Sequence, residues 1–246
     1  EISIIIPTFK RRSEVECIRA IERDPFSDYE VLLQDEDRAT TARNEGIKRA
    51  ESRKLVFFDD DSMPREGYLS RVSDVLEEEF CVAGKTVHPR DDLFSKHFTT
   101  HYDFGEAPRY VNRFWGCNMA ARKEVFEEVG FWDENIPWGH EELELADRVL
   151  TAYPIYYDPS LVVDHPYVDS IVDYWKKMYR IERQKPYLWR KQGVSKSQQW
   201  VKILEPAITP TKYLGRSVSS TVARGGANLS RTLGRIRGMY SRNRHG

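Results

Sequence analysis

Hydrophobic residues in the first third of the chain form short apolar runs separated by longer amphipathic segments. Residues 2–6 are almost entirely β-branched, which predicts a strand that is buried on both faces. Residues 30–33, 55–58 and 81–87 predict three further strands. Strands that alternate with helices indicate right-handed βαβ units, so we expect an α/β fold with a mostly parallel sheet and helices on both faces.

Helices are expected between these strands. Ser13 and Glu16 have the S-x-x-E spacing of a capping box, which predicts that a helix begins there. Apolar residues recur every three or four positions from Tyr68 to Phe80 and predict another helix. Residues 88–114 are polar and aromatic without a clear period, so a loop is expected there.

Fewer elements are predicted in the second half of the chain. Residues 116–130 indicate a short strand and a helix that ends at a glycine. Residues 137–150 predict a helix that carries Glu142 on the same face as its buried apolar residues. Residues 155–163 predict a last strand.

One apolar run ends in three carboxylates, in the stretch LVFFDDDS (residues 55–62). If this run is a strand, Asp59 and Asp61 point to the same side at its carboxyl end. Two like charges raise each other's pKa unless a cation holds them, and Mg²⁺ is commonly held by one or two carboxylates together with phosphate oxygens. The pattern therefore indicates a metal ion and a phosphorylated substrate, although an isolated D-x-D is often only an acidic turn.

Two other groups could act on a substrate at this edge of the sheet. Glu142, which follows Glu141 in the first helical turn, is a possible general base if it faces the core. The alternative is that both glutamates only complement the helix dipole, which contributes under about 1 kcal/mol. His165 ends the last predicted strand and could ligate a metal, although a single histidine is usually structural.

Composition narrows the class of protein. The 246 residues suffice for one large domain or for a domain with an appendage. No run of 18 apolar residues and no signal-peptide pattern occurs, so a cytoplasmic protein is expected. The three cysteines are odd in number and widely spaced, which argues against a disulfide framework and a cysteine-based zinc site.

The charges are unevenly distributed. Residues 1–201 carry 29 Lys and Arg against 38 Asp and Glu, whereas residues 202–246 carry nine against one. The basic end includes a predicted helix, residues 228–244, in which apolar and basic residues lie on opposite sides. This helix could lie on an anionic membrane surface, or it could pack its apolar stripe on the catalytic domain or a second subunit. The stripe consists of Leu229, Leu233, Ile236 and Tyr240, and the opposite side carries Arg231, Arg235 and Arg242.

Seven motifs follow one another along the chain: SIIIPTFKR, the strand-end Asp35, ARNEGIKRA, FFDDDSMP, GCNMAARKEVFEEVGFWDE, GHEELELADR and VVDHP. Together and in this order they resemble the motifs of family 2 glycosyltransferases, which have the Rossmann-like GT-A fold. The resemblance implies a catalytic domain over residues 1–170, with a nucleotide-sugar half (about 1–87) and an acceptor half (about 88–170), and a helical, basic extension over residues 171–246.

The resemblance also implies roles for individual residues. The nucleotide of a UDP- or GDP-sugar would bind through Pro7, Thr8 and Asp35, with Arg43 and Asn44 near the diphosphate and Asp60 near the ribose. Asp61, assisted by Asp59 and by His165, would hold Mn²⁺ or Mg²⁺.

The acceptor side carries a departure from the family pattern. Inverting members have a Glu-Asp pair whose second residue takes the acceptor proton, and this chain has Glu141-Glu142 in its place. The stretch WGHEELEL is similar to the W-G-G-E-[DN] motif of galactosyl- and N-acetylgalactosaminyltransferases, which places Trp138, Gly139 and His140 on the acceptor side. Retaining members of that group have Asn where this chain has Glu142, so inversion is expected.

Two other classes of function fit the sequence less well. A nucleotidyltransferase would show a glycine-rich basic loop after its first strand, and PTFKRR contains no glycine. The other alternative is a non-catalytic protein that binds a nucleotide sugar or a nucleic acid through its basic tail. Nucleic-acid binding is disfavoured because the body is acidic and only the tail is basic. We therefore expect a glycosyltransferase that uses a nucleotide-sugar donor and a glycan or polyprenyl-linked acceptor, and whose basic end contacts a membrane surface.

Overall fold

The computed structural model describes residues 1–209, 213–215 and 217–241. The chain divides into two compact units. Residues 1–137 and 141–167 form the first, which we call the sheet unit. The second, which we call the helical unit, contains the chain from residue 168 onward together with Trp138–His140. The segment 138–140, which the sequence predicted to lie in the catalytic domain, therefore clusters with the helical unit.

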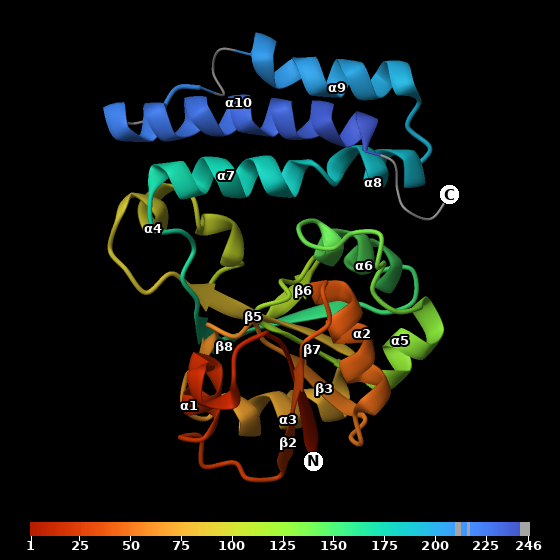
Figure 1. The fold of residues 1–246 in the computed structure, drawn as a ribbon. Helices are drawn as coiled ribbons and strands as arrows, with labels where there is room; N and C mark the ends of the chain where they lie inside the picture. The colour runs from red at the N-terminus through yellow and green to blue at the C-terminus, as the bar shows by residue number, and fades with distance from the viewer. Residues whose placement is uncertain (210–212, 216, 242–246) are drawn as a thin grey trace. The chain divides into compact units, whose positions relative to one another are not determined.

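The sheet unit is built on a mixed β-sheet (Figure 1). Its strands follow the order β2-β1-β3-β7-β5-β8-β4, and β6 pairs with β8. Their bounds are β1 (Ile2–Pro7), β2 (Tyr29–Gln34), β3 (Lys54–Phe57), β4 (Met63–Pro64), β5 (Cys81–Val87), β6 (Arg109–Val111), β7 (Met119–Arg122) and β8 (Ile155–Asp164).

Most strands run in one direction, as predicted, but the sheet also contains antiparallel pairs. β1 pairs in parallel with β2 and β3, and β5 pairs in parallel with β8. β7, however, lies antiparallel between β3 and β5, with Val56 opposite Ala120. Apolar periodicity identifies a strand but does not show which strands lie beside it in the sheet. The position of β7, which comes later in the chain than β3 and β5, could therefore not be predicted from the pattern.

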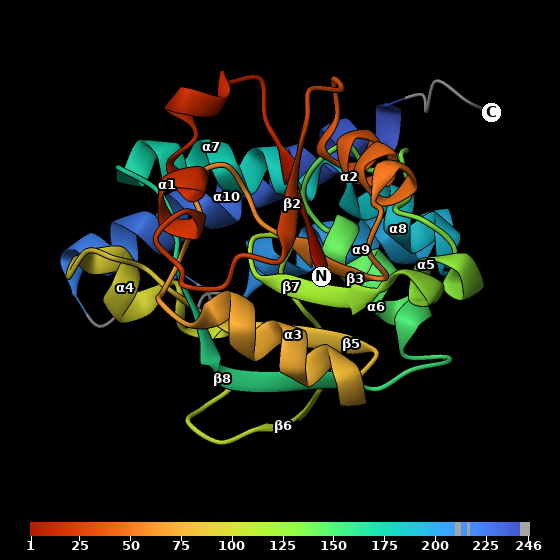
Figure 2. The same cartoon turned by 90° about the horizontal axis from the view of Figure 1, so that it is seen from below.

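The sheet has a hydrophobic core on each face. Ile4 and Ile6 of β1 pack in one core with residues of α1 and α3, whereas Ile5 packs in the other with residues of α2, α5 and α6. This alternation confirms that residues 2–6 form a strand buried on both faces. Figure 2 shows α3 along β5 and β8. The helices of this unit are α1 (Glu16–Ile21), α2 (Ala39–Arg49), α3 (Tyr68–Glu78), α4 (Leu93–His97), α5 (Lys123–Val129) and α6 (Glu141–Val149).

Two local predictions for this unit were wrong. The capping box of Ser13 and Glu16 does not form, because α1 begins at Glu16 with Val15 as its N-cap and without a side-chain cap. Val15 is fully buried, and Ser13 falls in a separate 3₁₀ turn. The predicted loop over residues 88–114 contains short elements, namely α4, a 3₁₀ turn (Thr100–Tyr102) and β6.

In the helical unit, α10 (Val218–Tyr240) packs between α7 (Ile171–Glu182) and α9 (Lys196–Ile208) (Figure 1). A further helix, α8 (Lys185–Lys191), follows α7. The contact between α10 and α7 depends on glycines. A Cβ at Gly234 would lie 2.5 Å from the carbonyl oxygen of Tyr179, and one at Gly238 would lie 2.2 Å from that of Arg183. Larger residues there would force the two backbones apart.

The C-terminal helix therefore packs with the face opposite to the one predicted for a protein contact. Leu229, Leu233 and Tyr240 of the apolar stripe are 59%, 50% and 70% exposed, and Ile236 is half-buried. Glycine permits a closer approach of two helices than leucine does, which explains the choice of face. Arg242 and the predicted helical residues 242–244 lie outside the described residues.

The arginines of the predicted polar face point inward. The Arg235 guanidinium donates to the Glu182 carboxylate at 2.6 Å, and that of Arg231 donates to the Tyr174 hydroxyl at 3.2 Å. None of the helices in the described part of the chain combines the length and the apolar composition needed to cross a membrane.

Candidate active site

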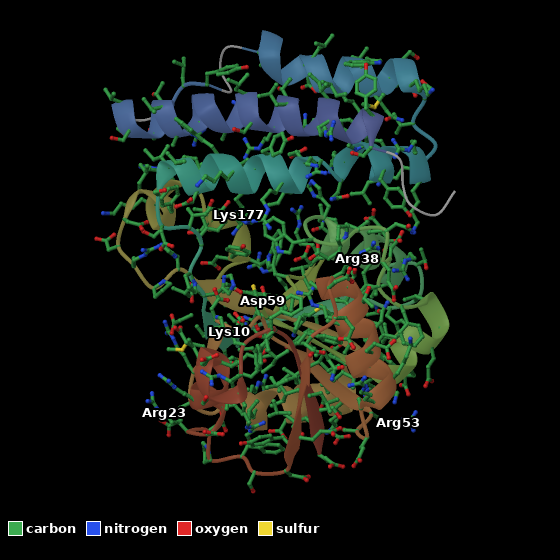
Figure 3. All side chains as sticks on the ribbon, viewed as in Figure 1. Lys10, Arg23, Arg38, Arg53, Asp59 and Lys177 are labelled. Atoms are coloured by element: carbon green, nitrogen blue, oxygen red, sulfur yellow. The ribbon has the colours of Figure 1, made fainter. Side chains whose placement is uncertain are left out.

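The carboxyl ends of β1, β2 and β3 bring several predicted donor-binding residues to one edge of the sheet. The Thr8 hydroxyl donates to Asp60 Oδ2 at 2.7 Å, and the Thr8 amide donates to the carbonyl of Gln34 at 2.8 Å. Lys10, which the sequence did not single out, donates to Asp60 Oδ1 at 3.0 Å. Figure 3 labels Lys10 and Asp59 at this edge. Pro7 ends β1, and Asp35 follows β2 with an exposed side chain.

The same edge gathers the three predicted metal ligands. His165 Nε2 lies 3.2 Å from Asp61 Oδ1 and 3.6 Å from Asp59 Oδ2. The backbone explains the arrangement, since the His165 amide donates to the carbonyl of Val87 at 2.9 Å and so holds the end of β8 beside that of β5. Asp59 and Asp61 both reach His165, but they follow the end of β3 in a turn in which the Ser62 amide donates to the carbonyl of Asp59 at 3.1 Å, so the predicted strand alternation is not the reason.

Asp59 and His165 influence each other strongly. Burial pushes the pKa of Asp59 upward, but hydrogen bonding and charge attraction from His165 and Arg43 outweigh it and lower this pKa to about 2. Burial pushes the pKa of His165 downward, and the carboxylates of Asp59 and Asp61 reverse this and raise it to about 9. Without a metal the histidine is thus a cation between two carboxylates, occupying the electrostatic role that a metal ion would take.

Cys117 is a neighbour of this group that sequence reasoning missed. Ligand atoms of Asp59, Cys117 and His165 all lie within 4.8 Å of one another. Ser62 connects the two segments, because its hydroxyl accepts from the Asp59 amide and donates to the carbonyl of Cys117. The one signal in the sequence was the position of Cys117 just before a predicted strand. That position does not distinguish a cysteine of a metal site from a buried structural cysteine.

The residues present fit a divalent cation. Carboxylate oxygens suit Mg²⁺ and Mn²⁺, imidazole is an accepted ligand of transition metals, and the thiol of Cys117 is a softer neighbour. The buried His165 Nδ1 has no hydrogen-bond partner among the described residues. A buried polar atom without a partner beside two carboxylates is consistent with a site completed by a ligand.

Arg43 connects this group to α6. Its Nη2 lies 3.0 Å from Asp59 Oδ1 and its Nη1 lies 3.4 Å from Glu141 Oε1. The guanidinium is 4.9 Å from the centre of the Trp132 ring, and a Cβ at Gly116 would lie 2.6 Å from it. Arg43 is only 2% exposed. The resemblance placed this side chain near the diphosphate, and the structure gives it two carboxylate partners.

Asn44 has a structural set of contacts. Its side-chain amide donates to the carbonyl of Trp132 and to Glu134, and its Oδ1 accepts from the Trp132 amide at 2.9 Å. These bonds tie α2 to the segment that leads toward α6. The amide predicted to lie near the diphosphate is therefore engaged within the sheet unit.

The two glutamates at the start of α6 differ in burial, and not in the way the sequence predicted. Glu141 is 2% exposed and lies with Leu145 and Val149 on the buried face, whereas Glu142 is half-buried. Glu142, which was predicted on the inner face, is therefore less deeply buried than Glu141, which pairs with Arg43. Burial, reinforced by the charge of Glu142, raises the pKa of Glu141.

The predicted acceptor-side residues 138–140 form a turn in the helical unit. The Arg180 guanidinium lies 5.1 Å from the centre of the Trp138 ring. Gly139 has φ of 84°, and a Cβ there would lie 2.9 Å from the Cα of Ile181. His140 also has a positive φ, 71°, which is uncommon for a residue with a side chain. This turn immediately precedes Glu141 in the sequence.

A mixed α/β sheet with carboxylates and a histidine gathered at its carboxyl edge is the arrangement of the GT-A fold. Residues 31–130 match the family described as "Glycosyl transferase family 2". A curated relative, glycosyltransferase AglE of Haloferax volcanii, is 22% identical over 177 residues, which cover 69% of this chain and 58% of the relative. Residues 31–130 are thus similar to family 2 glycosyltransferases, and the chain has a mixed α/β fold with a central sheet.

Solved structures resemble the chain in fold. The structure of GalNAc-T7 with UDP, GalNAc and Mn²⁺ superposes with a TM-score of 0.54 at 14% identity, covering 69% of this chain and 43% of that one. The structure of TarS from S. aureus gives a TM-score of 0.52 at 16% identity, covering 75% and 39%. The chain spans little more than half the length of the curated relative and about two fifths of each solved chain.

Proposed function

We propose that the sheet unit transfers a sugar from a nucleotide-sugar donor to a hydroxyl acceptor with inversion at the anomeric carbon, and that it depends on Mn²⁺ or Mg²⁺. The observation that carries this proposal is the convergence of Asp59, Asp61 and His165 beside the Thr8–Asp60 pair at one edge of the sheet. Ligands of open α/β sheets bind beyond such strand ends.

The donor side has distinct tasks for its residues. Asp60, held by Thr8 and Lys10, is positioned to accept hydrogen bonds from hydroxyl groups of the nucleotide. Asp61, Asp59 and His165 would hold the metal ion, which supplies charge neutralisation for the departing diphosphate. A metal at these groups requires His165 to be neutral, so its binding would release a proton.

On the acceptor side we assign the base to Glu142. Its carboxylate accepts the proton of the acceptor hydroxyl as that oxygen bonds to the anomeric carbon and the carbon–oxygen bond to the diphosphate breaks. Glu141 is buried against Arg43 and so serves as a positioning residue. Retaining galactosyl- and N-acetylgalactosaminyltransferases have Asn at the position of Glu142. A carboxylate there supports direct displacement of the diphosphate by the acceptor hydroxyl, and hence inversion.

A screen of nucleotide sugars tests this function. UDP-sugars with Mn²⁺ come first, since the GalNAc-T7 structure contains UDP and Mn²⁺. We expect at least one UDP- or GDP-sugar to raise the melting temperature and to be hydrolysed slowly, and both effects to disappear in EDTA. Stabilisation by a nucleoside triphosphate with release of pyrophosphate would instead favour a nucleotidyltransferase. The absence of any nucleotide-sugar effect with either metal would contradict the proposal.

We also propose that the exposed apolar face of the helical unit contacts an anionic membrane surface. Val201, Leu204, Val222, Leu229 and Leu233 of α9 and α10 are all about half exposed or more. Exposed apolar side chains in such number on two adjacent helices indicate a contact surface. The exposed cations Lys202 and Arg237 on the same helices would add attraction to anionic lipid, about 1 kcal/mol each.

Vesicle co-sedimentation of the full chain tests the membrane contact. The double variant Leu229→Asp/Leu233→Asp should bind vesicles containing phosphatidylglycerol about 10²-fold or more weakly, because burial of each leucine contributes roughly 1.5–3 kcal/mol. Leu150→Asp changes an exposed leucine of the sheet unit and should bind normally. Equal pelleting of wild type and double variant, or none by either, would remove the membrane contact and leave a second subunit as the occupant of this face.

A further inference from the structure

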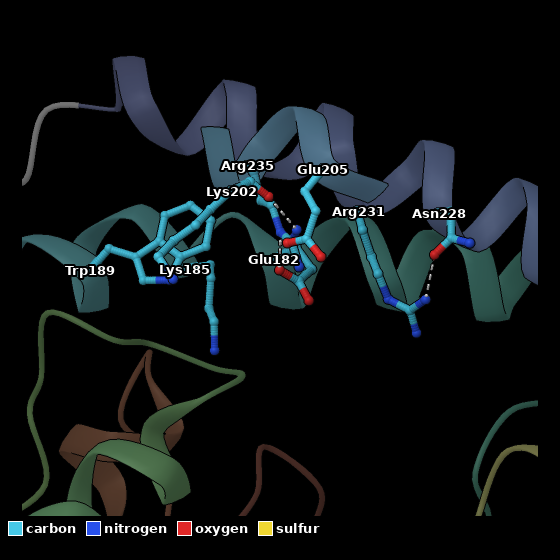
Figure 4. A pocket seen from close by; sticks show the side chains of 8 residues that line it. All are labelled: Glu182, Lys185, Trp189, Lys202, Glu205, Asn228, Arg231 and Arg235. Carbon is cyan, nitrogen blue, oxygen red and sulfur yellow. Dashed lines mark hydrogen bonds and ion pairs between the residues drawn. The ribbon is translucent and has the colours of Figure 1, made fainter. Parts of the chain in front are cut away.

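The helical unit contains a hollow that the proposed function does not use. Its volume is about 410 Å³, within the range of small-molecule sites and larger than a lone phosphate needs. Each of the four helices α7 to α10 contributes to its walls. Figure 4 shows the lining residues, which are Glu182, Lys185, Trp189, Lys202, Glu205, Asn228, Arg231 and Arg235.

The lining carries an excess of positive charge. Four cations face two carboxylates, and Glu182 is already paired with Arg235 at 2.6 Å. Arg231 and Arg235 are four residues apart on α10, so their side chains lie on the same side of the helix. Like charges at this spacing destabilise a helix. A bound anion would offset that cost.

The arginines are held in place by groups around them. Arg235 also donates to the carbonyl of Lys202 at 3.2 Å, and its guanidinium lies 5.6 Å from the centre of the Trp189 ring. Arg231 donates to Asn228 Oδ1 at 3.1 Å as well as to the Tyr174 hydroxyl. In Figure 4, Lys185 and Arg231 extend to the same side of the helices, with Glu182 between them. Donors fixed in advance lose little conformational entropy when an anion binds.

The cluster affects a neighbouring histidine in the same unit. His140 Nε2 lies 4.0 Å from Glu182 Oε1, a position at which a carboxylate alone would favour the protonated ring. Instead burial lowers the pKa of His140 to about 4, and Lys185, Arg235 and Arg231 contribute to that lowering. The charges of this cluster therefore act on the residue that immediately precedes the Glu141–Glu142 pair in the chain.

We propose that this hollow binds a phosphate or diphosphate group carried by an organic ligand. Guanidinium and ammonium groups are the donors that bind phosphate oxygens, and the volume leaves room for the group to which the phosphate is esterified. We further assign that ligand as the acceptor, because Glu182 in the wall of the hollow lies 4.0 Å from His140, one of the residues expected on the acceptor side. This assignment rests on the proposed function, whereas the anion site does not.

Calorimetric titration of the full chain with methyl diphosphate and with inorganic pyrophosphate, in EDTA, tests the site without the metal-dependent donor site. We expect both probes to bind, and Arg231→Gln and Lys202→Gln each to raise the dissociation constant about tenfold, since each removes one charge-assisted hydrogen bond. Lys202 is exposed, so its substitution leaves the fold intact even if Arg231→Gln does not. The matched control Arg237→Gln changes an exposed arginine of α10 outside the hollow and should bind normally.

Failure to bind either probe, or equal binding by wild type and both pocket variants, would overturn the site. Binding of pyrophosphate without binding of methyl diphosphate would overturn the assignment of the site to an organic ligand.

If the hollow binds the probes, the acceptor role is tested by transfer kinetics. Lys202→Gln should raise KM for a phosphate-bearing acceptor and leave kcat and the donor KM unchanged. Unchanged KM with intact probe binding would overturn the acceptor assignment, whereas probe binding by a chain that transfers no sugar would contradict only the proposed function.

Discussion

Replacement of Asp61 by Asn is expected to abolish metal-dependent sugar transfer while leaving the protein folded. A metal ion at a developing diphosphate charge contributes several kcal/mol to the transition state, so the rate should fall by about 10²-fold or more. Asp61 is half-buried and pairs with His165 at 3.2 Å. Its neighbour Asp59 is also one of two carboxylate partners of the buried Arg43, so a change at Asp59 would lower stability as well as activity and would not separate the two effects.

The measurement is the Mn²⁺ dependence of initial transfer rates, with melting temperature as the check on folding. Asp74→Asn removes an exposed carboxylate from α3, outside the site, and should behave as wild type. The single variants His165→Ala and Asp61→Asn should each weaken Mn²⁺ binding. Wild-type transfer that persists undiminished in EDTA would show that the metal prediction is wrong, and an Asp61→Asn enzyme with normal Mn²⁺ dependence would remove Asp61 from the ligand set.

The longer strands of the sheet unit could be predicted because a short apolar run marks each of them in the sequence, whereas the short strands β4 and β6 were not predicted. A β-branched run such as residues 2–6 is buried wherever its neighbours lie, and strand ends in an α/β protein meet at one edge. That rule was sufficient to bring Asp59, Asp61 and His165 together before any coordinates were known. The insertion of β7 between β3 and β5 was not predictable from periodicity, because strand order is decided by contacts between distant segments.

The position of Arg43 shows the same limit within the site. Its carboxylate partners lie 16 and 98 residues away in sequence, and the resemblance assigned it to a ligand. Only the fold reveals that it joins Asp59 to Glu141. Glu141, which pairs with Arg43, is also the more buried of the two glutamates. The amphipathic pattern of α6 did not predict this, because it contains no information about a buried cation.

The C-terminal helix shows that a hydrophobic stripe need not be the face that packs within a unit. The stripe of Leu229, Leu233, Ile236 and Tyr240 predicted contact with an anionic membrane or, alternatively, packing on protein. Within its unit the helix instead packs with Gly234 and Gly238, which have no side chain to register in such a pattern. Close backbone approach is an alternative source of packing energy, and it leaves the leucines exposed for another partner.

Replacement of Glu142 by Gln is expected to lower kcat by about 10²- to 10⁴-fold, the usual contribution of a general base. Glutamine has nearly the same shape but does not accept the acceptor proton, so donor binding and the melting temperature should not change. The acid limb of the kcat–pH profile, which reports ionisation of the base, should disappear in this variant. Glu127→Gln, an exposed position of α5, is the matched control.

The pair Glu141 and Glu142 can be distinguished by the same profile. Burial raises the pKa of Glu141, so if Glu141 were the base, transfer would require deprotonation of a group with a raised pKa and the acid limb would be displaced to higher pH. Glu141→Gln should instead act through position, because the Arg43 guanidinium loses its carboxylate partner at 3.4 Å and Asp59 is then held less firmly. It should therefore weaken Mn²⁺ dependence and stability while keeping the acid limb. A Glu141→Gln enzyme without the limb, beside a Glu142→Gln enzyme of nearly normal kcat, would reverse the two roles.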